Sequence, residues 1–295
     1  MANPTYTYDN QAIRESLLDI ITNISPTETQ LYTGLARSSA SQPRHEWPKD
    51  TLNAAADNAQ IEASAAGDGG QTDPTRAANY TQIFRKVYEV SDTDRASDAA
   101  GFKDRVAYEM NKAMKEWKND VEFALVRGSL ASGTGSAARR LQGVKNFIST
   151  NATAQSGVSL SETILNSYFE LSWNSGGNVD EVYVDGTLKR RISGFTGGAT
   201  KNVDVEDKRL VNSVDVYESD FGLVKIFLHR HMTVSGDNNF DIVGIQSDKW
   251  AVAHLREPEN VPLAKTGSST KAMIEGELTL ESKAEAANFL GTAHL

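Results

Sequence analysis

Two histidines separated by one residue, His229 and His231, are the side chains in this sequence best spaced to bind a metal ion. Side chains two apart on a β-strand point to the same face, so both imidazoles could coordinate one metal. The sequence shows no third ligand to complete such a site. We therefore expect the pair to be polar residues on a solvated or interfacial strand face, and a metal-dependent hydrolase that uses them is the competing hypothesis.

Other patterns that support catalysis or nucleotide binding do not occur. The chain has no cysteine, which excludes disulfides, thiol nucleophiles and Cys-based zinc or iron–sulfur sites. The glycine-rich stretches 128–135 and 194–201 lack the spacing and the placed lysine of a phosphate-binding loop. No G-x-G-x-x-G opens a helix after a strand, and no G-x-S-x-G is found. We expect no cofactor and no enzymatic activity.

Charged clusters have simpler explanations than catalysis. Asp92 and Asp94 could act as a general acid and base, but they precede a predicted helix, whose N-terminus favours negative charge. The acidic pair in 256–260 (REPEN) is expected in a proline turn. The arginine doublet 139–140 could contact phosphate, although a surface salt bridge explains it more simply. None of these clusters predicts an active site.

The composition is that of an ordinary folded protein. The chain has 295 residues, of which 39% are hydrophobic, and a formal net charge of −9. A protein that gripped DNA tightly would carry a basic face, which an acidic balance does not favour. No stretch of about 18 apolar residues predicts a membrane span. The N-terminus lacks the basic and apolar regions of a secretory signal.

The first 91 residues divide into an N-terminal arm, 1–43, and a long excursion, 44–91. The arm contains one amphipathic stretch, 13–24, which predicts a short helix that Pro26 ends. The excursion has strand-like limbs around a tip, 53–78, that is rich in Ala, Gly, Asp and Asn. About 25 residues with little apolar surface need a partner outside the chain. We interpret the excursion as a hairpin that packs on a neighbouring copy, with a disordered interdomain linker as the alternative.

A long helix over 98–127 is the clearest predicted element. Its apolar residues recur at steps of three, four or one, which indicates one buried face. Ser97 and Asp98 are placed to cap its start, and Gly128 to end it. At 1.5 Å per residue it would span about 45 Å and act as the spine of a domain. The apolar stripe consists of Phe102, Val106, Met110, Ala113, Met114, Trp117, Val121 and Leu125.

A mixed α/β module follows the spine helix. Ser159 and Glu162 predict a capping box at the start of a second helix, and a short helix is expected at 186–193. The last expected strand, 271–281, has one apolar face and one polar, acidic face. Strands are also expected at the apolar runs 181–184, 210–217, 222–228, 240–245 and 250–255.

Several short motifs follow one another in a specific order along nearly the whole chain. They are W-x-x-D-x-L at Trp47, Asp50 and Leu52, NYTQI at 79–83, E-x-A-L-V-R-G at 122–128, R-x-L-Q-G-V at 139–144, S-W-x-x-G-G at 172–177, the strand 180–184, and A-K-T-G-S-S-T-K at 264–271 leading into E-x-T-L-E at 277–281. In this order and spacing, the chain resembles the major capsid proteins of tailed bacteriophages, whose Hong Kong 97 type of shell fold is shared with encapsulins.

The resemblance implies an α+β, Hong Kong 97-like capsid fold. Its parts would be the arm 1–43, the extended loop 44–91, a peripheral domain of 92–150 and 261–295 built on the spine helix, and an axial α/β domain of 151–260. In such shells the extended loop lies over an adjacent subunit. The axial domains meet at the five- and six-fold axes.

The resemblance also implies a function. The chain would be a major capsid protein that self-assembles, as pentamers and hexamers, into an icosahedral shell enclosing double-stranded DNA without sequence-specific binding. Assembly in the host cytoplasm and a final location in the virion are expected. Expected partners are other copies of itself, a separate scaffold protein, a portal protein and, in some shells, decoration proteins; no membrane is expected.

The base of the extended loop and its charged surroundings are the expected contacts between subunits. Trp47 is the expected anchor, because a large aromatic side chain in a polar segment is a natural interface hot spot. Glycines in the tip, 64–70, and at 128–135 and 197–198 would let one sequence fit slightly different neighbours. The candidate interface residues are Arg44, Glu46, Trp47, Asp50, Glu62, Lys265, Lys271 and Glu277.

Two other assemblies remain open at this point. An encapsulin-like compartment shell would share the fold and hold a cargo enzyme. Another virion component, such as a tail-tube subunit, would form rings or tubes. Genomic neighbours distinguish the first alternative, and the shape of the assembled particle distinguishes the second.

Overall fold

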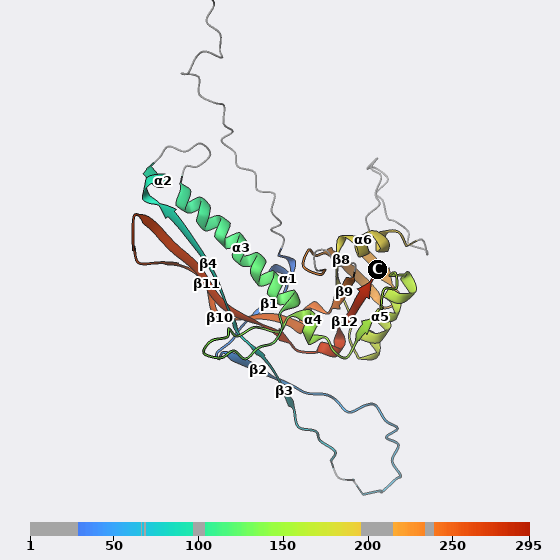
Figure 1. Cartoon of the computed structure of the whole chain (residues 1–295). Helices are drawn as coiled ribbons and strands as arrows, with labels where there is room; N and C mark the ends of the chain where they lie inside the picture. The colour runs from blue at the N-terminus through green and yellow to red at the C-terminus, as the bar shows by residue number, and fades with distance from the viewer. Residues whose placement is uncertain (1–28, 66, 68, 97–103, 196–214, 234–238) are drawn as a thin grey trace, which may run out of the picture.

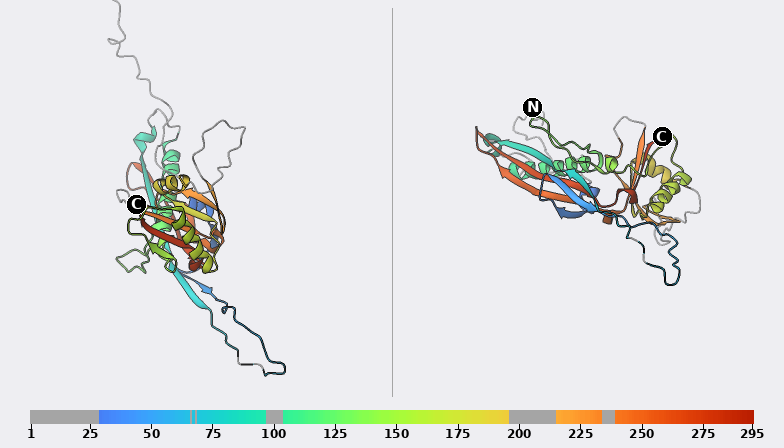
Figure 2. Two further views of the ribbon diagram at one scale, coloured as in Figure 1. Left: turned by 90° about the vertical axis from the view of Figure 1, so that its right-hand side faces the viewer. Right: turned by 90° about the horizontal axis from the view of Figure 1, so that it is seen from below.

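The computed structural model describes residues 29–65, 67, 69–96, 104–195, 215–233 and 239–295. A four-stranded sheet with a long helix along it forms one body, and a six-stranded sheet with two helices forms the other (Figure 1). A two-stranded hairpin projects beyond both bodies (Figure 2). The helix expected within 13–24 lies outside the described residues. Within the described ranges, no helix is long and apolar enough to cross a membrane.

The four-stranded sheet runs in the order β1 (Ala36–Ser39), β10 (Trp250–Pro262), β11 (Ser269–Ser282) and β4 (Gln82–Ser91). β1 is parallel to β10, and the other neighbours are antiparallel. β11 contains the expected strand 271–281 and its predicted alternation, because Ile274, Leu278 and Leu280 are all fully buried. These side chains belong to the same apolar core as Trp117 of the spine helix.

The spine helix is α3 (Arg105–Arg127), and its apolar stripe is confirmed from Val106 to Leu125. Its start is corrected: the carboxylate of Asp104 caps it by accepting from Val106 N–H at 2.9 Å. The predicted caps at 97 and 98 fall in the undescribed range 97–103, and a short helix, α2 (Asp92–Ala96), precedes it. With 23 residues, α3 is about 35 Å long rather than 45 Å. Gly128 follows its end, as predicted.

Residues 30–40 correct the expected boundary of the arm, which was predicted to have little core of its own. They form α1 (Gln30–Gly34) and β1, and Leu31, Tyr32 and Leu35 are buried in the core that contains the spine helix. The reason is tertiary. Three apolar residues in one short segment are too few to establish a period, and they are buried because the sheet and α3 lie beside them.

The six-stranded sheet runs in the order β5 (Ala152–Ala154), β12 (Phe289–His294), β9 (Phe240–Ile245), β6 (Glu181–Val184), β8 (Gly222–Leu228) and β7 (Val216–Ser219). Two helices, α5 (Glu162–Asn174) and α6 (Gly186–Ser193), pack against it around a second apolar core. The N-cap of α5 is Ser161, whose hydroxyl accepts from Ile164 N–H at 3.3 Å. The capping box predicted from Ser159 is therefore wrong.

Sheet membership agrees with the expected start of the axial module at 151, where β5 begins the six-stranded sheet, but it differs from the expected division after residue 249. β10 belongs to the four-stranded sheet, and the expected turn at 256–260 lies within this strand, beside irregularities in its register. β12 was not predicted, and it returns from the four-stranded body into the six-stranded sheet. Its placement requires Gly291, because a Cβ there would lie 2.8 Å from the Tyr168 ring. Strand pairing between distant segments, rather than local pattern, decides these memberships.

The excursion 44–91 also divides differently from the expectation. Only β2 (Arg44–Lys49) and β3 (Thr75–Tyr80) form the projecting hairpin, whereas β4 is an edge strand of the four-stranded sheet. The remaining short elements are α4 (Val144–Phe147), η2 (Ser247–Lys249) and η3 (Glu285–Ala287).

The glycines expected to act as flexible joints differ in their surroundings. A Cβ at Gly128 would lie 2.5 Å from Leu141 O, so this position is a close backbone contact and the expectation of a flexible joint is wrong there. In contrast, a Cβ at Gly67 or Gly70 in the hairpin tip would meet nothing within 4 Å. Glycines 197 and 198 lie outside the described residues.

Candidate assembly surfaces

Every described residue of the hairpin tip, from Asp50 to Pro74, is exposed. Beyond the last paired residues, Lys49 and Thr75, the described residues of the tip have no regular structure. The side chains of Leu52 and Ile61 are 98% and 83% exposed. A bond of 3.1 Å from Asn53 Nδ2 to Gly70 O joins the two sides of the tip. This segment therefore presents apolar side chains that its own chain does not cover.

The base of the hairpin, in contrast, is firmly attached. Trp47 is buried, and its indole N–H donates to Ser282 O at 2.8 Å. Its ring centroid lies 6.3 Å from that of Phe147, which in turn lies 5.8 Å from that of Trp250. Trp47 thus anchors the hairpin to its own body. A role for Trp47 in contacts between subunits stays a prediction.

Asn79, on the other strand of the hairpin, fixes the base from the opposite side. It is buried, and its Nδ2 donates to Leu280 O at 2.8 Å and to Gln142 O at 3.2 Å. Its Oδ1 accepts from Gln142 N–H at 2.9 Å. The side chain therefore ties β3 to β11 and to the segment after the spine helix. Its role was not predicted from the sequence, although it opens the NYTQI motif.

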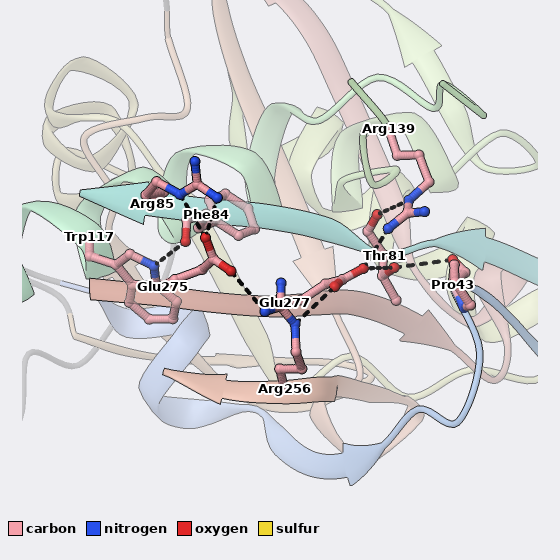
Figure 3. A network of polar contacts seen from close by, with 9 residues as sticks. All are labelled: Pro43, Thr81, Phe84, Arg85, Trp117, Arg139, Arg256, Glu275 and Glu277. Atoms are coloured by element: carbon pink, nitrogen blue, oxygen red, sulfur yellow. Dashed lines mark hydrogen bonds and ion pairs between the residues drawn. The ribbon is translucent and has the colours of Figure 1, made fainter. Parts of the chain in front are cut away.

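A network of charges crosses the four-stranded sheet next to the hairpin (Figure 3). At its centre, the buried Glu277 of β11 accepts from Thr81 Oγ1 at 2.6 Å and from Arg139 at 2.7 Å. Its second oxygen accepts from Arg256 Nε at 3.2 Å. Charged donors compensate the burial of this carboxylate. The salt bridge expected for the doublet 139–140 is present at Arg139.

The network continues along the sheet through Glu275. Its two oxygens accept from Arg256 at 2.7 Å and from Arg85 Nε at 2.6 Å (Figure 3). The hydrogen bonds from Arg256 and then Arg85 lower the pKa of Glu275 below its ordinary value. The same pairing raises the pKa of Arg256. β4, β11 and β10 are thereby joined by side chains as well as by backbone hydrogen bonds.

These charges lie on the face of the sheet that turns away from the spine helix. On the other face, the ring of Phe84 lies 6.2 Å from that of Trp117, whose indole donates to Phe84 O (Figure 3). Since side chains alternate along a strand, Ile83, Arg85 and Val87 point the other way. Ile83 and Val87 are 47% and 50% exposed. This face, which we call the open sheet face, combines apolar side chains with half-exposed arginines.

The other predicted interface residues lie in three places. Arg44 and Glu46 are on β2 and form an ion pair at 3.1 Å, which Arg76 extends. Asp50 and Glu62 are exposed in the tip. Lys265 and Lys271, at the far end of the four-stranded sheet, pair within the chain with Asp92 and Glu89. The hydrogen bond from Lys265 lowers the pKa of Asp92. Hydrogen bonds from Ser269 and then Lys271 lower the pKa of Glu89. Pairing of these residues across subunits stays a prediction.

The histidine pair that could have bound a metal ion is not on a solvated strand face. His229 follows β8 and is buried, with its Nε2 2.7 Å from Glu122 Oε1. His231 Nε2 lies 2.9 Å from Asn119 Oδ1. No group of three His, Asp or Glu side chains among the described residues could hold a metal ion. Glu122 itself was missed, although a charged residue between Val121 and Leu125 of the apolar stripe is a usable signal.

A family model and one relative each match nearly the whole chain. The sequence model of the family described as SU10 major capsid protein matches residues 2–293. The major capsid protein of Escherichia phage Phieco32 is 26% identical over 95% of this chain and 94% of its own length.

Solved structures show the same fold at low sequence identity. The capsid asymmetric unit of cyanophage A-1(L) is similar with a TM-score of 0.68 at 12% identity, over 98% of this chain and 97% of that one. A structure from Gordonia phage Cozz gives 0.65 at 12% identity, over 98% and 93%. The predicted α+β, Hong Kong 97-like fold is confirmed. With its sequence matched from residue 2 to residue 293, the chain belongs to the SU10 major capsid protein family.

Proposed function

We propose that many copies of this protein close into an icosahedral shell of pentamers and hexamers around double-stranded DNA, held together by the hairpin tip of each copy lying on the next. The observation that carries the proposal is the exposure of Leu52 and Ile61 on a segment without a core. A long segment without a core is usually either functional or a disordered linker, and exposed apolar side chains on it mark an interaction site. The contribution of the chain is structural rather than catalytic, and its final location is the virion.

The open sheet face of a second copy is the surface that fits the tip. It offers the apolar Ile83 and Val87, next to the arginines of the Glu275 network. Residues 50–74 contain five acidic and no basic side chains, so the tip and these arginines attract each other. Apolar residues in the middle with charges around them are the usual anatomy of an interface.

The energy of one such contact is modest, and repetition makes the shell stable. Burying an exposed Leu or Ile side chain contributes about 1.5–3 kcal/mol. Two of them give roughly 3–6 kcal/mol per tip before the entropy of ordering the tip is subtracted. A closed shell repeats the contact at each copy, and multivalency turns weak contacts into a lasting assembly. Weak single contacts also allow subunits that add wrongly to dissociate again.

The comparisons support a head shell over the two alternative assemblies, the encapsulin-like compartment and the tail tube. The net charge of −9 supports enclosure of DNA without tight or sequence-specific binding. Scaffold, portal and decoration proteins are partners that the proposal expects, because a closed shell must be templated, must admit DNA and must withstand its pressure.

Particle assembly with and without the apolar side chains of the tip tests the proposal. The double variant Leu52→Ser, Ile61→Ser is expected to keep the thermal midpoint of the wild type, because both side chains are exposed, and to lose closed shells in negative-stain microscopy. Leu130→Ser, Val158→Ser is the matched control, since these side chains are also exposed but lie outside the hairpin and the four-stranded sheet. Normal shells from the tip variant would refute the proposal.

A further inference from the structure

A fully buried carboxylate in the spine helix receives hydrogen bonds from the N-terminal segment. Glu122 Oε1 accepts from Leu31 N–H at 2.8 Å, and Glu122 Oε2 accepts from Tyr32 N–H at 2.8 Å. Both donors belong to the first turn of α1, where the N-cap residue Thr29 makes no capping hydrogen bond with its side chain. The free backbone N–H groups at the start of a helix are usually bonded by a capping side chain next to them in the sequence. In α1 the side chain of Glu122, 90 positions away from Tyr32, takes this role.

The same carboxylate receives a third hydrogen bond from the other body. His229 follows β8 of the six-stranded sheet, and its Nε2 lies 2.7 Å from Glu122 Oε1. His229 Nδ1 accepts from the backbone N–H of His231 at 3.2 Å. Because Nδ1 acts as the acceptor, the proton of the neutral ring is on Nε2 and is donated to Glu122. One buried anion thus has three donors, two from α1 and one from the six-stranded body.

The surroundings of His229 hold it in this position. The ring of Tyr183 on β6 packs edge-on to it at 5.9 Å between centroids, and burial raises the pKa of that tyrosine, which stays neutral. Its hydroxyl donates to Glu181 at 2.7 Å, away from the histidine. His231, the donor to His229, is itself bonded to Asn119 of the spine helix. The imidazole therefore has little freedom to leave Glu122 unless the six-stranded body moves.

We propose that Glu122 is a positioning residue that couples the docking of α1 to the seating of the six-stranded body on the spine helix. When a buried carboxylate loses one hydrogen-bond donor, the cost of burying its charge is less well compensated. The whole site, including the hydrogen bonds to the remaining donors, then becomes less stable. The coupling is reciprocal, as for any two binding events that share one group. A movement of the six-stranded body would therefore change how firmly α1 is held on the spine helix. This inference does not depend on what the hairpin contacts.

Hydrogen exchange of the full-length chain tests the coupling, with the amides of Leu31 and Tyr32 as the readout. His229→Leu removes the donor without touching α1, and it is expected to speed exchange of these amides by about tenfold or more, within the usual range for coupled sites. His229→Gln keeps an N–H donor and is expected to restore most of the protection. His294→Gln is the control, because His294 is buried in the same sheet but bonds Tyr168 instead, at 3.0 Å.

The outcome that overturns the proposal is equally specific. If His229→Leu loosens residues 225–232 and leaves the amides of Leu31 and Tyr32 unchanged, the two attachments are independent. If that variant does not fold, His229→Phe takes its place, because it keeps an aromatic ring but has no N–H to donate to Glu122. Faster exchange of the Leu31 and Tyr32 amides in this variant supports the coupling, and unchanged exchange refutes it.

Discussion

Removal of the Trp47 side chain is expected to detach the hairpin from its body without unfolding the protein. Replacement of a buried aromatic residue by Ala typically costs about 3–5 kcal/mol. The Trp47 ring lies between those of His45, on its own strand, and Phe147, on the body, so only part of its packing attaches the hairpin and the lower value applies. About 3 kcal/mol corresponds to a roughly 100-fold larger population of the opened hairpin base. Trp47→Phe keeps most of the ring and loses only the hydrogen bond to Ser282 O, worth about 1 kcal/mol.

Hydrogen exchange of the β2 and β3 amides measures this opening, and the amides of α3 serve as an internal reference because they are bonded within the helix, whereas β2 and β3 pair with each other. The expected order of exchange rates is Trp47→Ala, then Trp47→Phe, then wild type, with α3 unchanged. Shell yield should fall in the same order, with Trp47→Ala the most impaired, because a detached hairpin no longer aims its tip at a neighbour. Exchange in Trp47→Ala within about threefold of the wild type would refute the assignment of Trp47 as the anchor.

Two further predictions concern stability. A Cβ at Gly276 would lie 2.8 Å from Trp117 Cζ2 and 3.1 Å from Pro258 Cα. Gly276→Ala is therefore expected to lower the free energy of unfolding, measured in urea, by about 1–3 kcal/mol. Gly267→Ala is the control and should leave this free energy unchanged, because nothing lies within 4 Å of a Cβ at that position. Burial lowers the pKa of His294 below its ordinary value of 6.5, so the unfolded chain binds the proton more tightly and stability falls as the pH drops through 6.5. His294→Gln should reduce this slope without abolishing it, because burial also lowers the pKa values of His231 and His254; an unchanged slope would contradict the assignment.

The elements predicted with the right type and place are those that carry a complete local pattern. The stripe of α3, the short helix at 186–193, and the strands β6, β8, β9 and β11 each repeat apolar residues with the period of one secondary structure. The tip of the excursion was recognised by the opposite signal, a long segment with too little apolar surface to bury. Such features can be predicted from the local sequence alone, because the pattern that shows which face is buried is complete within a few turns of helix or a few strand residues.

Membership in a sheet was decided only by tertiary structure. β10 and β12 are apolar enough to be strands in either body, and the register with β11 and β9 assigns one to each sheet. The start of α3 moved to Arg105 because Asp104, rather than an earlier residue, caps it. The three core side chains of residues 30–40 are buried only through tertiary contacts, because three apolar side chains are too few to establish a period in the sequence.

The sequence by itself indicated the resemblance to phage major capsid proteins, through ordered motifs, and the presence of an uncovered hairpin tip. Only the tertiary structure showed that Glu277 is shared by Arg139 and Arg256, and that Glu122 is shared by α1 and His229. These groups are far apart in the chain, and a carboxylate has no preferred sequence distance to its donors. Its partners are chosen when the chain closes and burial forces each remaining polar group to find one.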